Sequence, residues 1–277
     1  MARVTARVLP GFRLSLSFTL VYLSVLVLLP LGACIVTAAG LTWEQFRSAV
    51  WTERARAAYA LTFGASLAAA LISSVVGLLI AWVLVRYDFP AKRVFDSLVD
   101  LPFALPTAVA GLVFSNLYVA NGWLGQFLVP VGIEAAYSRL AIVVVLVFIG
   151  FPFVVRTLQP VIESLDAEVE EAAALLGANR WQTFRRVIFP SLMPALLTGF
   201  TLAFARGLGE YGSIVFVSGN MPFRTEIAAF LIVSRLEEGR PNSYKEATAI
   251  ATVLLVASFL MLVVINRLEA RSRRWDE

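Results

Sequence analysis

Residues 206–220 read RGLGEYGSIVFVSGN, and this stretch separates two incompatible folds. Gly207, Gly209 and Gly212 form G-x-G-x-x-G, the pattern of a loop that binds the pyrophosphate of a dinucleotide. Such a loop must follow a β-strand and open a helix. Residues 196–205, before the glycines, form a continuous apolar run without the alternation of a strand. The pattern therefore predicts a membrane-spanning segment with polar groups inside it.

The composition favours the membrane interpretation. Of the 277 residues, 59% are hydrophobic and 15% are charged, and the mean hydropathy is +0.81. Soluble domains carry about a quarter charged residues. The absence of histidine and the single cysteine, Cys34, argue against histidine-based catalysis and common zinc sites. Neither lysine, Lys92 or Lys245, lies in a P-loop pattern. We expect a polytopic membrane protein that is not an enzyme and binds no cofactor itself.

Six segments are apolar enough and long enough to cross a bilayer, which requires about 20 residues. They cover residues 15–38, 60–85, 94–120, 138–158, 191–218 and 247–266. The third contains Pro102 and Pro106, and the fifth contains the glycines of residues 206–220. Six spans place both termini on one side, and the positive-inside rule favours the cytoplasm, with fourteen basic residues against eight. We expect one all-α transmembrane domain, residues 1–277, with cytoplasmic termini.

Arg206 and Glu210 are four residues apart in the fifth predicted span, so they share one helix face and can pair. Charges inside a bilayer are costly and usually face a bundle interior or a water-filled path. Two compatible roles stay open, an ion pair that holds helices together and a wall of a translocation path. Tyr211 and Ser213 add polar groups nearby. These four residues are the candidates for the path.

The connection between the fourth and fifth spans predicts two short amphipathic helices. Apolar residues recur with helical spacing from Val169 to Leu176, after an acidic start that suits a helix N-terminus. Gly177 is expected to end this helix in the left-handed conformation. Asn179 is expected to cap the second helix, with Gln182 three residues later, and Pro190 to end it.

An apolar face displayed at the cytoplasmic surface needs a partner, either a protein or the lipid headgroups. The acidic residues at positions 166, 168, 170 and 171 argue against lipid, because the inner leaflet is itself negative. We therefore expect the connection to bind a protein.

This connection resembles the EAA motif of ABC importer permeases, E-A-A-x3-G-x9-I-x-L-P. The matching residues are Glu171-Ala172-Ala173, Gly177 after three residues, and Val187-Ile188-Phe189-Pro190 after nine more. Val187 and Phe189 depart from the pattern but stay apolar. The resemblance implies the type I importer architecture and a coupling loop at about residues 159–190. It implies that Glu171, Ala172, Ala173, Gly177 and Asn179 contact an ATP-binding subunit, and that ATP and magnesium bind to partner subunits.

Two further stretches resemble the sulfate/thiosulfate permeases, and within them the first of two paralogous permease subunits. They are DLPFALPTAVAGL, residues 100–112, and GEYGSIVFVSGNMPFRTEIA, residues 209–228. The resemblance extends from the first span to about residue 268. It implies a multi-pass protein of the bacterial cytoplasmic (inner) membrane, surrounded by membrane lipid, that binds no nucleic acid. The implied partners are the second permease subunit, two ATP-binding cassette subunits and a periplasmic or extracellular sulfate-binding protein.

Alternatives stay open for the substrate and for one segment. Molybdate permeases carry a related G-E-F-G stretch, so molybdate or another oxyanion is the nearest alternative. A secondary transporter would need no coupling loop and should show inverted repeats, which are not evident here. Within the outer segment, about residues 221–245, the apolar run Thr225–Leu236 predicts an interfacial or re-entrant helix. This helix either contributes to an outer gate or lies on the membrane surface.

Overall fold

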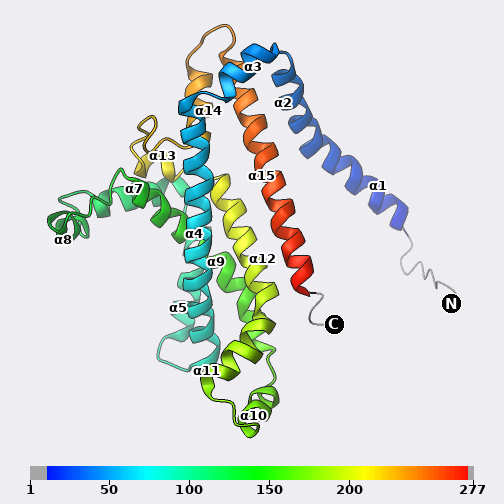
Figure 1. The fold of residues 1–277 in the computed structure, drawn as a ribbon, viewed down its shortest axis with the longest axis vertical. Helices are drawn as coiled ribbons and strands as arrows, with labels where there is room; N and C mark the ends of the chain where they lie inside the picture. Colours follow the sequence, from blue (N-terminus) through cyan, green and yellow to red (C-terminus); the bar gives the residue numbers. More distant parts are fainter. Residues whose placement is uncertain (1–10, 274–277) are drawn as a thin grey trace.

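The computed structural model describes residues 11–273, and within this range every regular element is a helix (Figure 1). This confirms the all-α fold class. Arg3, Arg7 and Arg274, which contribute to the orientation argument, lie outside the described residues, as do both ends of the expected domain.

Helices appear wherever the sequence is continuously apolar, and short helices connect them. In chain order they are α1 (Phe12–Leu23), the π-helical turn η1 (Ser24–Leu28), α2 (Leu29–Ala39), α3 (Trp43–Val50), α4 (Glu53–Arg86), α5 (Lys92–Val99), α6 (Leu101–Ala104), α7 (Thr107–Tyr118), α8 (Gly125–Leu128), the 3₁₀ turn η2 (Val129–Val131), α9 (Arg139–Glu163), α10 (Ala167–Leu175), α11 (Arg180–Thr183), the π-helical turn η3 (Phe184–Ile188), α12 (Phe189–Leu208), α13 (Ile214–Val217), α14 (Ala228–Glu237) and α15 (Ser243–Arg273).

The third expected span is not one helix. It is divided into α5, α6 and α7, and the chain is extended at Leu105 and Pro106, where ψ is 131° at both residues. A residue that precedes proline avoids the helical region, and proline itself donates no backbone hydrogen bond. Within the described residues, five continuous helices are long and apolar enough to cross a membrane, and α7 is a shorter apolar helix. The sixth crossing and the cytoplasmic termini stay predictions.

The fifth expected span is also interrupted. The helix α12 ends at Leu208, residues 209–213 are not helical, and α13 begins at Ile214. The fifth expected span is therefore two helical segments joined by a non-helical turn. Glycine loses more backbone conformational entropy than other residues when it is fixed in a helix, so Gly209 and Gly212 favour a break within this segment.

Pro190 does not end a helix, contrary to the expectation from the sequence. The helical stretch that begins at Arg180 continues through η3 into α12, and Pro190 lies in the first turn of α12. The wider π-helical turn before it accommodates a ring that an α-helical turn would exclude. The same arrangement occurs at Pro30, where η1 directly precedes α2.

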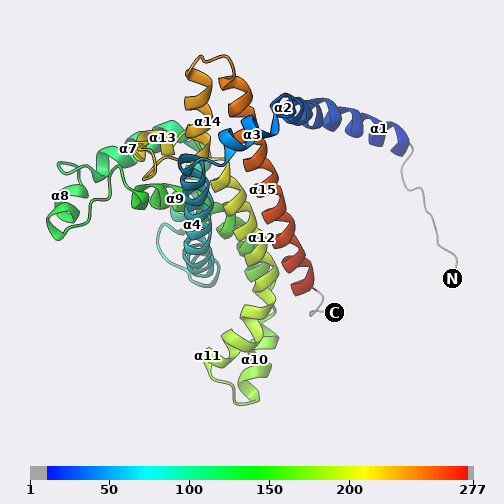
Figure 2. The same ribbon diagram turned by 45° about the horizontal axis from the view of Figure 1, so that its top comes forward.

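The core consists of α4, α9 and α12, which cross at close range. Glycines permit this approach, because a Cβ atom added at Gly77 or Gly199 would lie 2.7 or 2.8 Å from atoms of Val154. Val154 and Phe204 are fully buried between these helices. The helix α15 packs against α12 and α2. In both orientations, α1 and the α7–α8 region extend away from this core on opposite sides (Figures 1 and 2).

Candidate functional site

The polar centre of the molecule is the turn between α12 and α13. Glu210 in this turn is 2% exposed. Its Oε1 atom accepts hydrogen bonds from the backbone nitrogen and the Oγ of Ser213, both at 2.9 Å. Its Oε2 atom lies 2.7 Å from Nη1 of Arg206. The predicted ion pair is therefore present. Through its two hydrogen bonds with Ser213, Glu210 also holds the non-helical turn at residues 209–213 in place.

Arg206 occupies the last turn of α12, where the helix dipole favours a cation. Its side chain is 35% exposed, and Glu210 is its only ionic partner among residues 11–273. A guanidinium has five N–H donors, so donors beyond the Glu210 contact can bind an oxyanion. Tyr211 is half-buried beside the pair, and Ser213 is fully buried. The structure thus brings the four candidates together, with Ser213 supporting Glu210 and Arg206 left accessible.

The N-terminal half of α7 packs directly on this turn. A Cβ atom at Gly111 would lie 2.2 Å from the carbonyl oxygen of Ser213, and one at Gly212 would lie 2.4 Å from Oγ1 of Thr107. Real Cβ atoms do not approach so closely. Gly111 faces backbone atoms and therefore requires glycine, whereas a Cβ at Gly212 would require the Thr107 side chain to shift. The two stretches that resemble sulfate permeases therefore contact each other. Sequence reasoning missed Thr107 and Gly111, although the glycines and prolines in both stretches were a visible signal.

The connection at residues 159–190 has the predicted local structure. Gly177 has a φ of +83°, and the nitrogens of Gly177 and Ala178 donate to the carbonyls of Ala174 and Ala173 at 2.9 and 3.0 Å. This is the hydrogen-bond pattern of a left-handed helix cap. The side chains of Asn179 and Gln182 each accept a hydrogen bond from the other's backbone nitrogen, both at 2.9 Å. The predicted glycine cap and capping box are confirmed.

Large apolar side chains at this bend are not covered by any of the residues that the structure describes. Leu175 and Leu176 are both 89% exposed, and Trp181 is 67% exposed. Glu171 and Ala172 are exposed, and Ala173 is half-buried. Fully burying a leucine side chain is worth about 1.5–3 kcal/mol. Exposed apolar clusters of this kind are typical of interaction surfaces.

The neighbouring Glu170 anchors this connection to the rest of the molecule. Glu170 forms an ion pair with Arg86 at the end of α4. The Arg86 guanidinium lies 5.1 Å from the ring centroid of Trp82, and the Trp82 ring meets the Phe184 ring edge-on at 5.7 Å. These contacts connect α10 to α4, and α4 to the turn η3 that precedes α12. Sequence spacing gave no signal for this contact, because 84 residues separate its partners.

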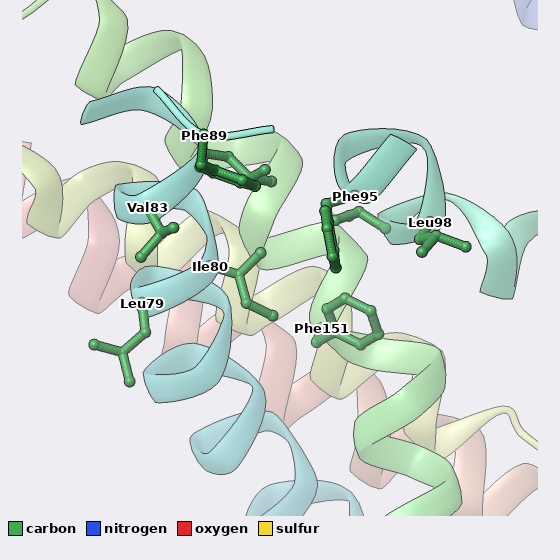
Figure 3. A pocket seen from close by; sticks show the side chains of 9 residues that line it. Leu79, Ile80, Val83, Phe89, Phe95, Leu98 and Phe151 are labelled. Atoms are coloured by element: carbon green, nitrogen blue, oxygen red, sulfur yellow. The ribbon is translucent and has the colours of Figure 1, made fainter. Parts of the chain in front are cut away.

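Two further features lie near α5. Arg156 of α9 binds Asp100 with Nε at 2.8 Å and Asp96 with Nη1 at 2.7 Å, which ties α5 to α9. Beside α5 lies an apolar pocket of about 510 Å³ (Figure 3). Its lining is entirely hydrocarbon, so it offers no group that recognises an oxyanion. The lining residues are Leu79, Ile80, Val83, Leu84, Phe89, Phe95, Leu98, Val99 and Phe151.

Comparison with known proteins gives a consistent result. The family model described as "Binding-protein-dependent transport system inner membrane component" matches residues 73–274. The "Sulfate transport system permease protein CysT" of Salmonella typhimurium is 46% identical over 274 residues, 99% of this chain and 98% of that protein. The protein of the same description from Synechocystis sp. is 49% identical over 257 residues, 93% of this chain and 89% of that protein.

A solved structure shares the architecture. It is the crystal structure of a bacterial alginate ABC transporter in complex with an alginate pentasaccharide-bound periplasmic protein. The TM-score is 0.73 at 18% identity, covering 94% of this chain and 93% of that chain. At this identity the likeness supports the fold alone.

Proposed function

Because the chain belongs to the family of binding-protein-dependent transport system inner membrane components, we propose that it is the permease subunit of an ATP-driven sulfate importer. The observation that carries this proposal is the 46% identity, over almost the full length of both chains, to a protein named as a sulfate transport system permease. The protein is then a transport component of the inner membrane rather than an enzyme. Thiosulfate shares the tetrahedral anionic form and stays a second cargo.

The coupling loop, residues 159–190, supplies the surface for an ATP-binding subunit. Leu175, Leu176 and Trp181 stand exposed around the Gly177 bend, which fits an apolar groove on a soluble partner. ATP and magnesium bind to that partner in this account. A paralogous permease subunit pairs with this chain, and a sulfate-loaded binding protein docks on the outer face.

One continuous helical stretch joins the coupling loop to the proposed translocation path and transmits the movement of the loop. It begins at Arg180, directly after the Gly177 bend, and ends at Leu208, two residues after Arg206. Its 29 residues span about 44 Å. The Arg86–Glu170 ion pair and the Trp82–Phe184 contact add α4 to the moving unit. Closure of the ATP-binding subunits on the loop therefore changes the position of Arg206.

Arg206 and Glu210 suit passage of a divalent anion rather than its retention. The exposed donors of Arg206 offer charge-assisted hydrogen bonds to a sulfate oxygen. Glu210 neutralises part of that charge at 2.7 Å, which weakens the attraction. A transport path must bind its cargo weakly enough to release it. The selectivity then belongs to the separate binding protein.

Reconstitution tests the proposal. The chain would be purified with its partner permease and ATP-binding subunits and placed in liposomes with the binding protein. Sulfate-loaded binding protein should stimulate ATP hydrolysis several-fold, and molybdate with the same components should not. Failure of the ATP-binding subunit to co-purify, or stimulation by molybdate alone, would contradict the proposal.

A further inference from the structure

The loop between α13 and α14 covers the outer side of the Glu210 turn. Its last residue, Ile227, is 1% exposed and packs in the same buried cluster as Ile214. Together with Thr62, Ser66 and Gly207, these two isoleucines line a narrow covered space beside Glu210. A side chain from the loop thus packs in the buried layer beside Glu210.

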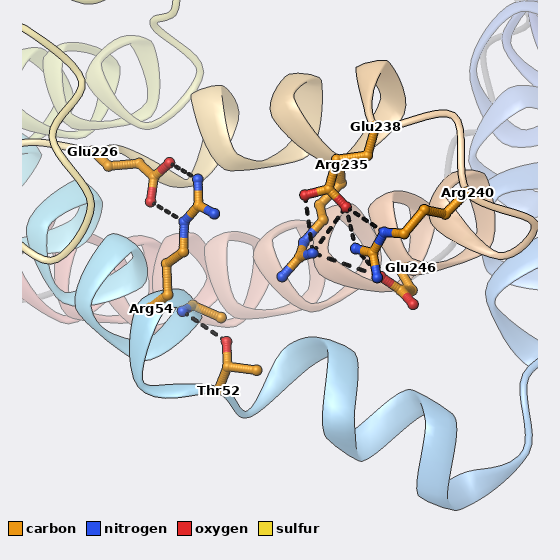
Figure 4. Close-up of polar contacts among 8 residues, drawn as sticks. Thr52, Arg54, Glu226, Arg235, Glu238, Arg240 and Glu246 are labelled. Carbon is orange, nitrogen blue, oxygen red and sulfur yellow. Dashed lines mark hydrogen bonds and ion pairs between the residues drawn. The ribbon is translucent and has the colours of Figure 1, made fainter.

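A buried carboxylate beside Ile227 fixes this loop to the start of α4. Glu226 is 2% exposed, and it accepts hydrogen bonds from Nε and Nη2 of Arg54 at 2.8 and 2.6 Å (Figure 4). The paired geometry matches the two guanidinium nitrogens to the two carboxylate oxygens. Arg54 lies in the first turn of α4, where the helix dipole disfavours a cation. The Glu226 carboxylate therefore offsets the unfavourable position of the Arg54 charge, and Arg54 neutralises the buried charge of Glu226.

Two further contacts hold the second half of the loop and the start of α14. Arg139 at the start of α9 donates from Nε to the carbonyl of Arg224 at 2.8 Å. The Oγ1 of Thr62 accepts a hydrogen bond from the nitrogen of Ala228 at 2.9 Å. Ile227 lies between Glu226 and Ala228, so its position depends on both contacts with α4.

The loop backbone is strained. Phe223 has a φ of +65° and Asn220 a φ of +50°. A bulky residue such as phenylalanine rarely adopts this conformation, and strain of this kind persists only where surrounding contacts impose it. The loop therefore has a conformational reason to change when its anchors separate.

We propose that Arg54 and Glu226 form a positioning pair that holds Ile227 over the Glu210 turn and keeps the path closed on its outer side. This inference rests on the proposed function, since it assigns the cover of the proposed sulfate path. Arg54 is 27% exposed at the surface, so it is within reach of a docking partner. Opening toward the outside then requires the pair to separate.

Accessibility of a reporter thiol tests the pair without reference to transport. Leu146 lines the covered space and is 3% exposed. The reporter Leu146→Cys would be introduced together with Cys34→Ser, and labelled with a membrane-impermeant maleimide in right-side-out vesicles that carry the assembled transporter. Glu226→Gln should raise the labelling rate roughly tenfold to a hundredfold, as expected for loss of a charged hydrogen-bonded partner.

A matched control is available in the same region. Arg240 pairs with Glu238 in the exposed group that also includes Arg235 and Glu246 (Figure 4). Arg240→Gln should leave the labelling rate unchanged. Equal labelling of the Glu226→Gln and parent proteins, or an equal increase with Arg240→Gln, would overturn the proposal.

The charge exchange Arg54→Glu with Glu226→Arg keeps the test decisive if the single variant does not accumulate. The exchanged pair should restore slow labelling relative to either single exchange, and fast labelling in the assembled double variant would overturn the positioning role.

ATP hydrolysis supplies a second readout. Without binding protein, Glu226→Gln should hydrolyse ATP about tenfold faster than the parent. If the parent protein shows no sulfate-dependent ATP hydrolysis, the proposed function is contradicted. The labelling rates still test whether Arg54 and Glu226 position Ile227.

Discussion

Replacing Gly177 by valine perturbs the coupling loop through its backbone alone. Gly177 has a φ of +83°, and a Cβ atom at this position would meet nothing within 4 Å. A valine side chain therefore has room, and its cost is conformational. The left-handed conformation costs a non-glycine residue about 1–2 kcal/mol. The population of the capped bend should therefore fall by a factor of roughly 5–30.

Binding of the purified ATP-binding subunit to the detergent-solubilised permease pair measures this population. The dissociation constant should rise by the same factor of roughly 5–30 for Gly177→Val. Gly177→Asn should bind almost as tightly as the parent, because asparagine tolerates the left-handed region.

The chain contains a matched control for backbone strain. Gly239, in the connection before α15, has a φ of +62° and also has nothing within 4 Å of a Cβ atom. Gly239→Val imposes a comparable strain at a site far from the coupling loop. Wild-type affinity in Gly177→Val would refute the assignment of the bend as the docking element. Equal weakening by Gly239→Val would show that the effect is general destabilisation.

Three other predictions have direct outcomes. Gly111→Ala should disrupt the packing of α7 on the turn and abolish uptake, since its Cβ would lie 2.2 Å from a backbone oxygen, while Gly64→Ala, with nothing within 4 Å, should keep uptake. Glu210→Gln should lower the unfolding free energy by about 1–3 kcal/mol because Arg206 loses its counter-charge. Adding Arg206→Met should recover part of this loss, and thermal unfolding of the assembled protein measures both. Hydrogen bonds and charge from neighbouring guanidinium groups, Arg240 first, hold the pKa of Glu238 below its ordinary value. The stabilisation from Glu238 should therefore be complete above its ordinary pKa, about 4.3, and be lost as the pH falls below it, which a comparison of melting temperatures with Glu238→Gln from pH 7 to pH 3 checks.

Local signals in the sequence predicted local structure well. The left-handed Gly177 and the reciprocal bonds of Asn179 and Gln182 depend on residues at most five positions apart, so the sequence pattern specifies them. The Arg206–Glu210 pair was predicted for the same reason, although Glu210 lies just beyond the end of its helix. These features determine the local structure of the coupling loop and of the Arg206–Glu210 pair.

Local sequence patterns did not predict the long-range contacts. The Arg54–Glu226 pair joins residues 172 positions apart, and the approach of Gly111 to Ser213 depends on how two interrupted segments meet. Hydropathy averages over about 20 residues and therefore did not register the breaks at Pro106 and Gly209. Pro190 was misread because a π-helical turn relieves the clash that would otherwise end the helix. Residue composition and hydropathy do not specify long-range contacts, helix breaks or π-helical turns.

Uptake of radiolabelled sulfate tests the central claim most directly. Cells that lack their own sulfate permeases would carry this chain with its cognate partner subunits, with and without excess unlabelled molybdate. Sulfate uptake that requires this chain and resists molybdate is the predicted result. Absence of sulfate uptake, together with chain-dependent uptake of molybdate by the assembled complex, would contradict it.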